Sequence, residues 1–169
     1  MEYLILTSFV IYCVYNIISL YTFGVPHSLS NTYYLWNDIK KGAGYAFSVC
    51  LGLIAALLLP VWLDMGADSS WQFLSFLTCG SLLFVAAAPN FKSLTIESTI
   101  HTVTAILSAI CAVLWIIIVA KLWIIILLTF MYVMIVAVSH GSLKSGYIYW
   151  LETIAFLSMY ISIYITYLY

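Results

Sequence analysis

Residues 95–119 read TIESTIHTVTAILSAICAVLWIIIV, and this stretch decides the fold class. It is a long apolar run in which the only acidic residue and the only basic residue, Glu97 and His101, stand near its start. A helix needs about 20 predominantly apolar residues to cross a bilayer. The run lacks the alternation of a barrel strand, and a helix is the other way to satisfy the backbone within lipid. The stretch therefore predicts a transmembrane helix.

Three similar runs precede it and two follow it. Short connections that are polar or contain glycine and proline separate the runs. Of the 169 residues, 66% are hydrophobic and 7% are charged, whereas a soluble domain carries about 25% charged residues. We therefore predict an all-α polytopic membrane protein, a bundle of six transmembrane helices that forms a single domain over residues 1–169. The predicted spans are about 3–21, 43–63, 71–87, 95–119, 122–138 and 147–167. In a bacterium this multi-pass protein would lie in the inner membrane.

The charges indicate partners and a topology. The net charge is −1 and there is no Arg, so nucleic acid, which needs clustered basic residues, is not an expected partner. Membrane lipids are expected partners, and a homo-oligomer is left open. The first, third and fifth connections hold all the Lys residues except Lys121. The positive-inside rule would place these connections in the cytoplasm.

Helical spacing gives the fourth span two distinct faces. One face is small and polar, and its members are Glu97, His101, Ala105, Ser108 and Ala112. The other is large and apolar, with Ile100, Val103, Leu107, Ile110 and Leu114. Because small residues let membrane helices approach closely, we expect this helix to be central, with Glu97 and His101 facing protein or a cavity. The sixth span has a similar stripe that begins at Glu152, and the fifth span, apolar almost throughout, is expected at the periphery.

An ionisable residue within a span is costly and is therefore a functional hypothesis. On the six-span arrangement, ionisable and polar residues from four parts of the chain gather on one side of the membrane. We predict that they form a polar pocket capped by the first connection. The candidates are His27, Ser28, Ser30, Asn31, Tyr34, Glu97, His101, His140 and Glu152.

Three functions remain open for such a pocket, and no catalytic residue is assigned. The first is binding of a lipid, a small molecule or a partner helix, without a cofactor. The second is a metal-dependent intramembrane lipid hydrolase, in which Glu97 and His101 with His140 or His27 would hold a zinc ion that activates water. The third is a small transporter or channel, which would need a polar path through the membrane.

Two stretches resemble a known family. They are PHSLSNTYY at 26–34 and FVAAAPNFKSLTIESTIHTVTAIL at 84–107. They look like the FRAG/DRAM/SFK-type six-span membrane family, in particular its bacterial branch of unknown function. The matching positions are Ser28, Ser30, Tyr33, Tyr34, Pro89 and His101, with Glu152 similar to an acidic residue of eukaryotic members.

The resemblance implies a six-span fold and little chemistry. Eukaryotic relatives are linked to lipid-anchor remodelling and membrane trafficking. Asn90 stands where bacterial members often have Asp. The family places the first connection outside the cytoplasm, opposite to the Lys count. A lesser likeness is to the ceramidase and progestin-receptor superfamily of metal-dependent hydrolases, through Ser98 and His101, but the late His pair of that superfamily is absent.

Overall fold

The computed structural model describes residues 1–92, 96–139 and 146–168, and within these the chain forms helices and connections without strands. The helices are α1 (Glu2–Phe23), α2 (Thr32–Ile39), α3 (Tyr45–Met65), α4 (Phe73–Ala87), α5 (Ile96–Ile118), α6 (Trp123–Ser139) and α7 (Tyr147–Leu168). The predicted all-α class is confirmed. Each of the six predicted spans corresponds to one long helix, with ends that agree to within about two residues, the usual uncertainty of a helix boundary.

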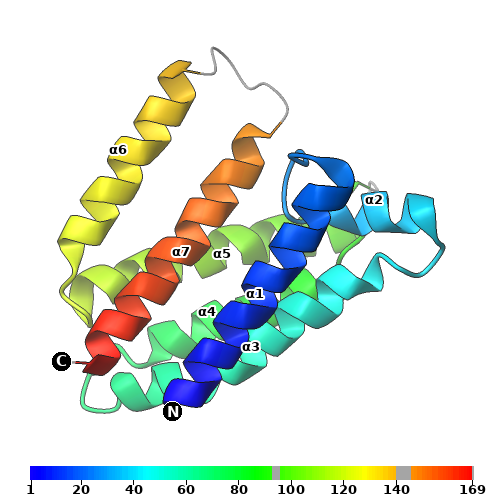
Figure 1. Ribbon diagram of the computed structural model, residues 1–169. Coiled ribbons are helices and arrows are strands. Elements are labelled where there is room, and N and C mark those ends of the chain that lie inside the picture. The colour runs from blue at the N-terminus through cyan, green and yellow to red at the C-terminus, as the bar shows by residue number, and fades with distance from the viewer. Residues whose placement is uncertain (93–95, 140–145, 169) are drawn as a thin grey trace.

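The first connection differs from the expected irregular segment because its second half forms α2, which has 8 residues. At about 1.5 Å per residue this helix is roughly 12 Å long, far short of a bilayer. Its start is set by the preceding turn, in which the Ser28 hydroxyl accepts a hydrogen bond from the Asn31 backbone N–H at 3.0 Å. The described residues therefore contain six long helices and one short helix that lies at an end of the bundle (Figure 1).

Four helices, α1, α3, α5 and α7, are long and apolar enough to cross a membrane. The other two long helices are apolar but shorter, with 15 residues in α4 and 17 in α6. At about 1.5 Å per residue they would extend roughly 22 and 25 Å, against about 30 Å for the hydrocarbon core. The membrane class follows from the four long helices.

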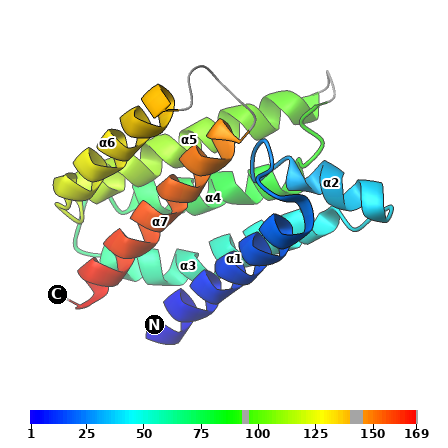
Figure 2. The same cartoon turned by 45° about the horizontal axis from the view of Figure 1, so that its top comes forward.

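The helices run alternately up and down, so both termini lie at one end of the bundle and α2 lies at the other (Figure 1). Helix α1 packs against α3, α3 against α4, and α4 against α5. Helix α7 completes the bundle through contacts with α1, α5 and α6. Figure 2 shows α6 on the outside of this arrangement. Almost all of its side chains between Trp123 and Val138 are exposed or half-buried, as expected for a peripheral helix.

Two large buried side chains, one from α3 and one from α5, pack against each other inside the bundle. Trp62 of α3 and Trp115 of α5 are both 0% exposed, and their rings meet edge to face with centroids 5.2 Å apart. Such aromatic pairs contribute about 0.5–1.5 kcal/mol beyond the area that they bury. On α5, His101 and Ser108 are buried, whereas the large apolar residues of the opposite face are exposed. The predicted orientation of this helix is confirmed from His101 onward, whereas Glu97 is exposed.

The end of α1 turns the chain back toward the bundle. Gly24 follows the helix with φ of 69°, in the region that favours glycine, and its N–H bonds to the Leu20 carbonyl. Pro26 then prevents a helical continuation. Residues 24–31, called here the plug loop, consequently leave the end of α1, and residues 27–30 contact α7 and α5.

Candidate functional site

Part of the plug loop, from Ser28 to Ser30, is buried in the end of the bundle. Ser28, Leu29 and Ser30 are 5%, 7% and 7% exposed. The Tyr149 N–H donates to the His27 carbonyl at 3.1 Å, and the Leu29 N–H donates to the Glu152 carboxylate at 2.5 Å. Both partners belong to the first turns of α7, so this helix supplies the loop with backbone partners that an irregular segment otherwise lacks.

His101 fixes the loop from the side of α5. Its Nδ1 lies 2.8 Å from the Ala88 carbonyl oxygen and its Nε2 lies 3.0 Å from the Ser30 hydroxyl. A carbonyl oxygen can only accept, so Nδ1 carries the proton, and in the neutral ring Nε2 accepts from Ser30. The ring also stacks on Phe91 with centroids 4.8 Å apart. His101 thus joins the first connection, the third connection and α5.

Tyr34 of α2 makes a second link between the first and third connections. Its hydroxyl donates to the Asn90 side-chain oxygen at 3.0 Å and accepts from the Lys92 N–H at 2.7 Å. The Lys92 ammonium lies 4.4 Å from the centre of the same ring, which adds a cation–π attraction. The two connections therefore form one layer over the end of the bundle.

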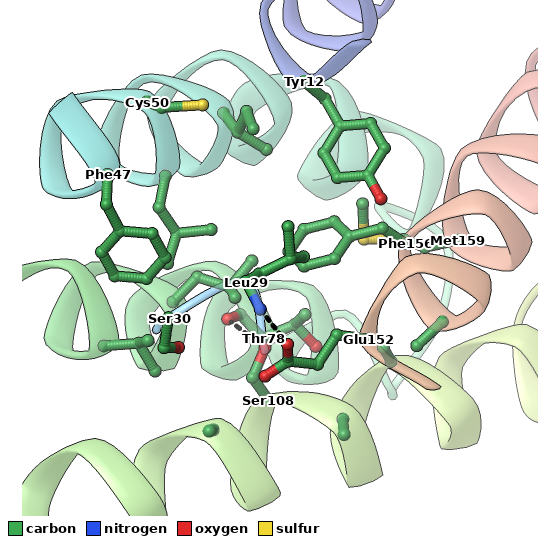
Figure 3. A pocket seen from close by; sticks show the side chains of 18 of the residues that line it. Tyr12, Leu29, Ser30, Phe47, Cys50, Thr78, Ser108, Glu152, Phe156 and Met159 are labelled. Carbon is green, nitrogen blue, oxygen red and sulfur yellow. Dashed lines mark hydrogen bonds between the residues drawn. The ribbon is translucent and has the colours of Figure 1, made fainter. Parts of the chain in front are cut away.

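A cavity of about 150 Å³ lies beneath this layer, between α1, α3, α4, α5 and α7. Its wall is mostly apolar and includes Ile54. Phe47 and Phe156 also contribute to it (Figure 3). Ala109 of α5 and Ala155 of α7 line the cavity and are also exposed. The cavity therefore reaches the molecular surface between α5 and α7, where both helices present small side chains.

Glu152 is the one acidic residue in the wall of this cavity. Figure 3 shows its carboxylate near Leu29, Thr78 and Ser108, with the hydrogen bond to the Leu29 N–H drawn. One oxygen, Oε2, accepts that bond. The side chain is half-buried and lines the cavity, so a ligand there can reach it.

The structure brings most of the predicted site residues together. Ser30 and Glu152 line the cavity, while Ser28, Asn31, Tyr34 and His101 form the layer above it. The His27 side chain is exposed, although its carbonyl belongs to the layer. His140 lies outside the described residues.

Glu97 is the exception. The sequence places it in the pocket beside His101, but the structure leaves it exposed on the first turn of α5. His101 instead turns both ring nitrogens toward Ala88 and Ser30. The acidic residue of the cavity is Glu152, which approaches from α7.

The predicted zinc site finds no ligand set among residues 1–92, 96–139 and 146–168, where no three His, Cys, Asp or Glu residues gather around a common point. Both nitrogens of His101 are engaged in hydrogen bonds, so a metal ion at Nε2 would have to displace Ser30. Participation of His140 stays a prediction.

Sequence reasoning missed the contribution of α1. Tyr12 and Asn16 line the cavity, and the Tyr149 hydroxyl donates to the Asn16 side-chain oxygen at 3.0 Å. The signal was available, because Ser8, Tyr12, Asn16 and Ser19 recur at helical spacing and are all buried. A polar stripe of this kind indicates the protein-facing side of a membrane helix, as the polar stripe of α5 does.

Comparisons with known proteins add no relative. No family model matches the chain, and neither a curated protein nor a solved structure shows significant similarity to it. The resemblance to the FRAG/DRAM/SFK-type family stays a prediction.

Proposed function

We propose that this protein crosses the membrane with all six of its long helices and binds a small apolar or lipid-like molecule in the cavity beneath the plug loop. The observation that carries the proposal is an apolar cavity, roofed by a hydrogen-bonded layer, with one carboxylate in its wall. Ligand sites are commonly of this kind, with a mostly apolar lining and a few polar groups that orient the ligand.

The size of the cavity limits what it can enclose. A cavity of about 150 Å³ that is lined by apolar side chains is large enough for benzene. The ligand is therefore either of about that size or a longer amphiphile of which one part enters. The exposed positions of Ala109 and Ala155 favour the second case, because the remainder of a longer molecule can extend between α5 and α7 toward the surrounding lipid.

The test is to fill the cavity and to measure bound ligand. Ala105 lines the cavity and is half-buried, while its neighbour Ile106 is 56% exposed on the opposite face. Wild-type protein, Ala105→Phe and Ile106→Phe would be purified in a mild detergent and examined by native mass spectrometry and by analysis of extracted lipids. We expect wild-type protein and Ile106→Phe to carry the same small molecule or lipid, and Ala105→Phe to lose most of it.

Two results would contradict the proposal. One is wild-type protein that carries no ligand and binds no added apolar probe. The other is a folded Ala105→Phe that retains ligand at the wild-type level. Should Ala105→Phe fail to fold, Ala112→Leu fills another part of the same wall with a smaller increase in volume.

A further inference from the structure

We propose that the ligand of the cavity carries a protonated amine that pairs with the Glu152 carboxylate, so that the site takes cationic amphiphiles. This inference rests on the proposed function and specifies its ligand class. It follows from the hydrogen-bonding character and the charge of the groups around Glu152, taken together with the apolar wall of the cavity.

Three hydroxyl groups in the wall of the cavity, those of Ser30, Thr78 and Ser108, have already used their protons. The Ser108 hydroxyl donates to the Thr78 carbonyl at 3.1 Å, and the Thr78 hydroxyl donates to the Leu74 carbonyl at 2.8 Å. The Ser30 hydroxyl donates to His101. What these side chains still offer to a ligand is lone pairs on oxygen. The Tyr12 hydroxyl has no partner among the described residues and can donate or accept. Acceptors therefore outnumber donors in this wall, and its complement is a group rich in donors.

The charge of Glu152 has no protein cation beside it in the described part of the chain. Lys40, Lys41, Lys92 and Lys121 are all exposed at the ends of the bundle. His27 is exposed as well, and His101 uses both ring nitrogens elsewhere. The Leu29 N–H is a neutral donor. A carboxylate in a mostly apolar wall is costly unless it is paired or protonated, and a cationic ligand would favour the ionised, paired form.

An ammonium group meets both requirements. It supplies three donors and one positive charge, which matches one carboxylate and its neighbouring hydroxyl oxygens. The apolar remainder of the ligand would fill the space next to Phe156 and Ile54 and leave between Ala109 and Ala155. A neutral alcohol would satisfy fewer acceptors and leave the charge unpaired, and a carboxylate ligand would place like charges together.

The test compares three probes that share one tail. Hexylamine, hexanol and hexanoate would be titrated into the purified full-length protein at neutral pH, with binding followed by calorimetry and by the shift in melting temperature. A charge-assisted hydrogen bond is about twice as strong as a neutral one. We therefore expect hexylamine to bind roughly tenfold more tightly than hexanol, a ratio that corresponds to about 1.4 kcal/mol. Hexanoate is expected to bind most weakly.

Matched variants test whether Glu152 causes the preference for hexylamine. Glu152→Gln should bring hexylamine to the affinity of hexanol, because the amide keeps the shape and removes the charge. Glu97→Gln changes an exposed carboxylate of α5 and should keep the preference for the amine. If Glu152→Gln does not fold, the probe series on wild-type protein decides, since equal or weaker binding of hexylamine overturns the inference by itself.

The outcomes separate the two proposals. Binding of hexanol and hexylamine with equal affinity, abolished for both by Ala105→Phe, would leave cavity binding in place and overturn the choice of amine. A preference for amine that persists in Glu152→Gln would overturn the role of this carboxylate. No binding of any probe to the wild-type protein would overturn both proposals.

Discussion

His101 connects positions that are far apart in the sequence, because its ring joins Ser30, 71 positions away, to Ala88. The His101 side chain is only 6% exposed. Water therefore cannot take its place as the hydrogen-bond partner of Ser30 and Ala88. Removing one partner of a buried hydrogen bond costs about 1–3 kcal/mol for each group left unsatisfied. The residue is therefore important to stability whatever the ligand is.

We predict that His101→Leu lowers the free energy of unfolding by about 2–4 kcal/mol, since it leaves a carbonyl and a hydroxyl without their partner. The measurement is thermal or denaturant unfolding of purified protein in one detergent, followed by circular dichroism. Glu97→Gln, on the exposed first turn of the same helix, serves as the control and should differ little from wild type. A loss no larger in His101→Leu than in this control would contradict the assigned hydrogen bonds.

At the scale of elements, α2 is held against the start of α3 by a close backbone approach. A Cβ on Gly44 would overlap the Tyr33 carbonyl oxygen and the Asn37 side chain. The Asn37 side-chain oxygen also accepts hydrogen bonds from the N–H groups of Gly42 at 2.9 Å and Gly44 at 3.1 Å. Glycine at position 44 therefore allows α2 to fold back over the bundle and to carry Tyr34 to its partners.

We predict that Gly44→Ala lowers the melting temperature, because the methyl group meets backbone atoms that cannot move aside independently. Gly80→Ala is the matched control, since a Cβ there meets nothing within 4 Å. Alanine within a helix is favoured over glycine by about 0.5–1 kcal/mol, so the control should melt at or above the wild-type temperature. If Gly44→Ala melted at the same temperature as Gly80→Ala, this result would contradict the close packing of α2 against α3.

For the whole molecule, the proposed six crossings would place the first and third connections on one side of the membrane and the second and fourth on the other. We predict that single cysteines at Asp38 and Lys92 share one pattern of labelling by an impermeant maleimide in intact cells. Cysteines at Asp68 and Lys121 should show the opposite pattern. The background would lack the four native cysteines, and permeabilised cells would control for reactivity.

Labelling also decides the orientation, on which the Lys count and the family resemblance disagree. Reaction of the Asp38 and Lys92 positions from outside would support the resemblance, and reaction of the other pair would support the positive-inside rule. If Asp38 and Asp68 were labelled from the same side, α3 would not cross, and the six-span proposal would fail.

The sequence by itself determined the six long helices, their ends to within about two residues, and the buried face of α5 from His101 onward. Run length and helical spacing are local properties that the sequence shows directly. Within lipid, an apolar run of this length must satisfy its own backbone hydrogen bonds and therefore forms a helix. Only the tertiary structure decided that Glu152, and not Glu97, lines the cavity. The bond from Leu29 to Glu152 joins positions 123 residues apart. Periodicity shows which face of a helix is buried, but it does not show which helix that face meets or how far a loop enters between two helices.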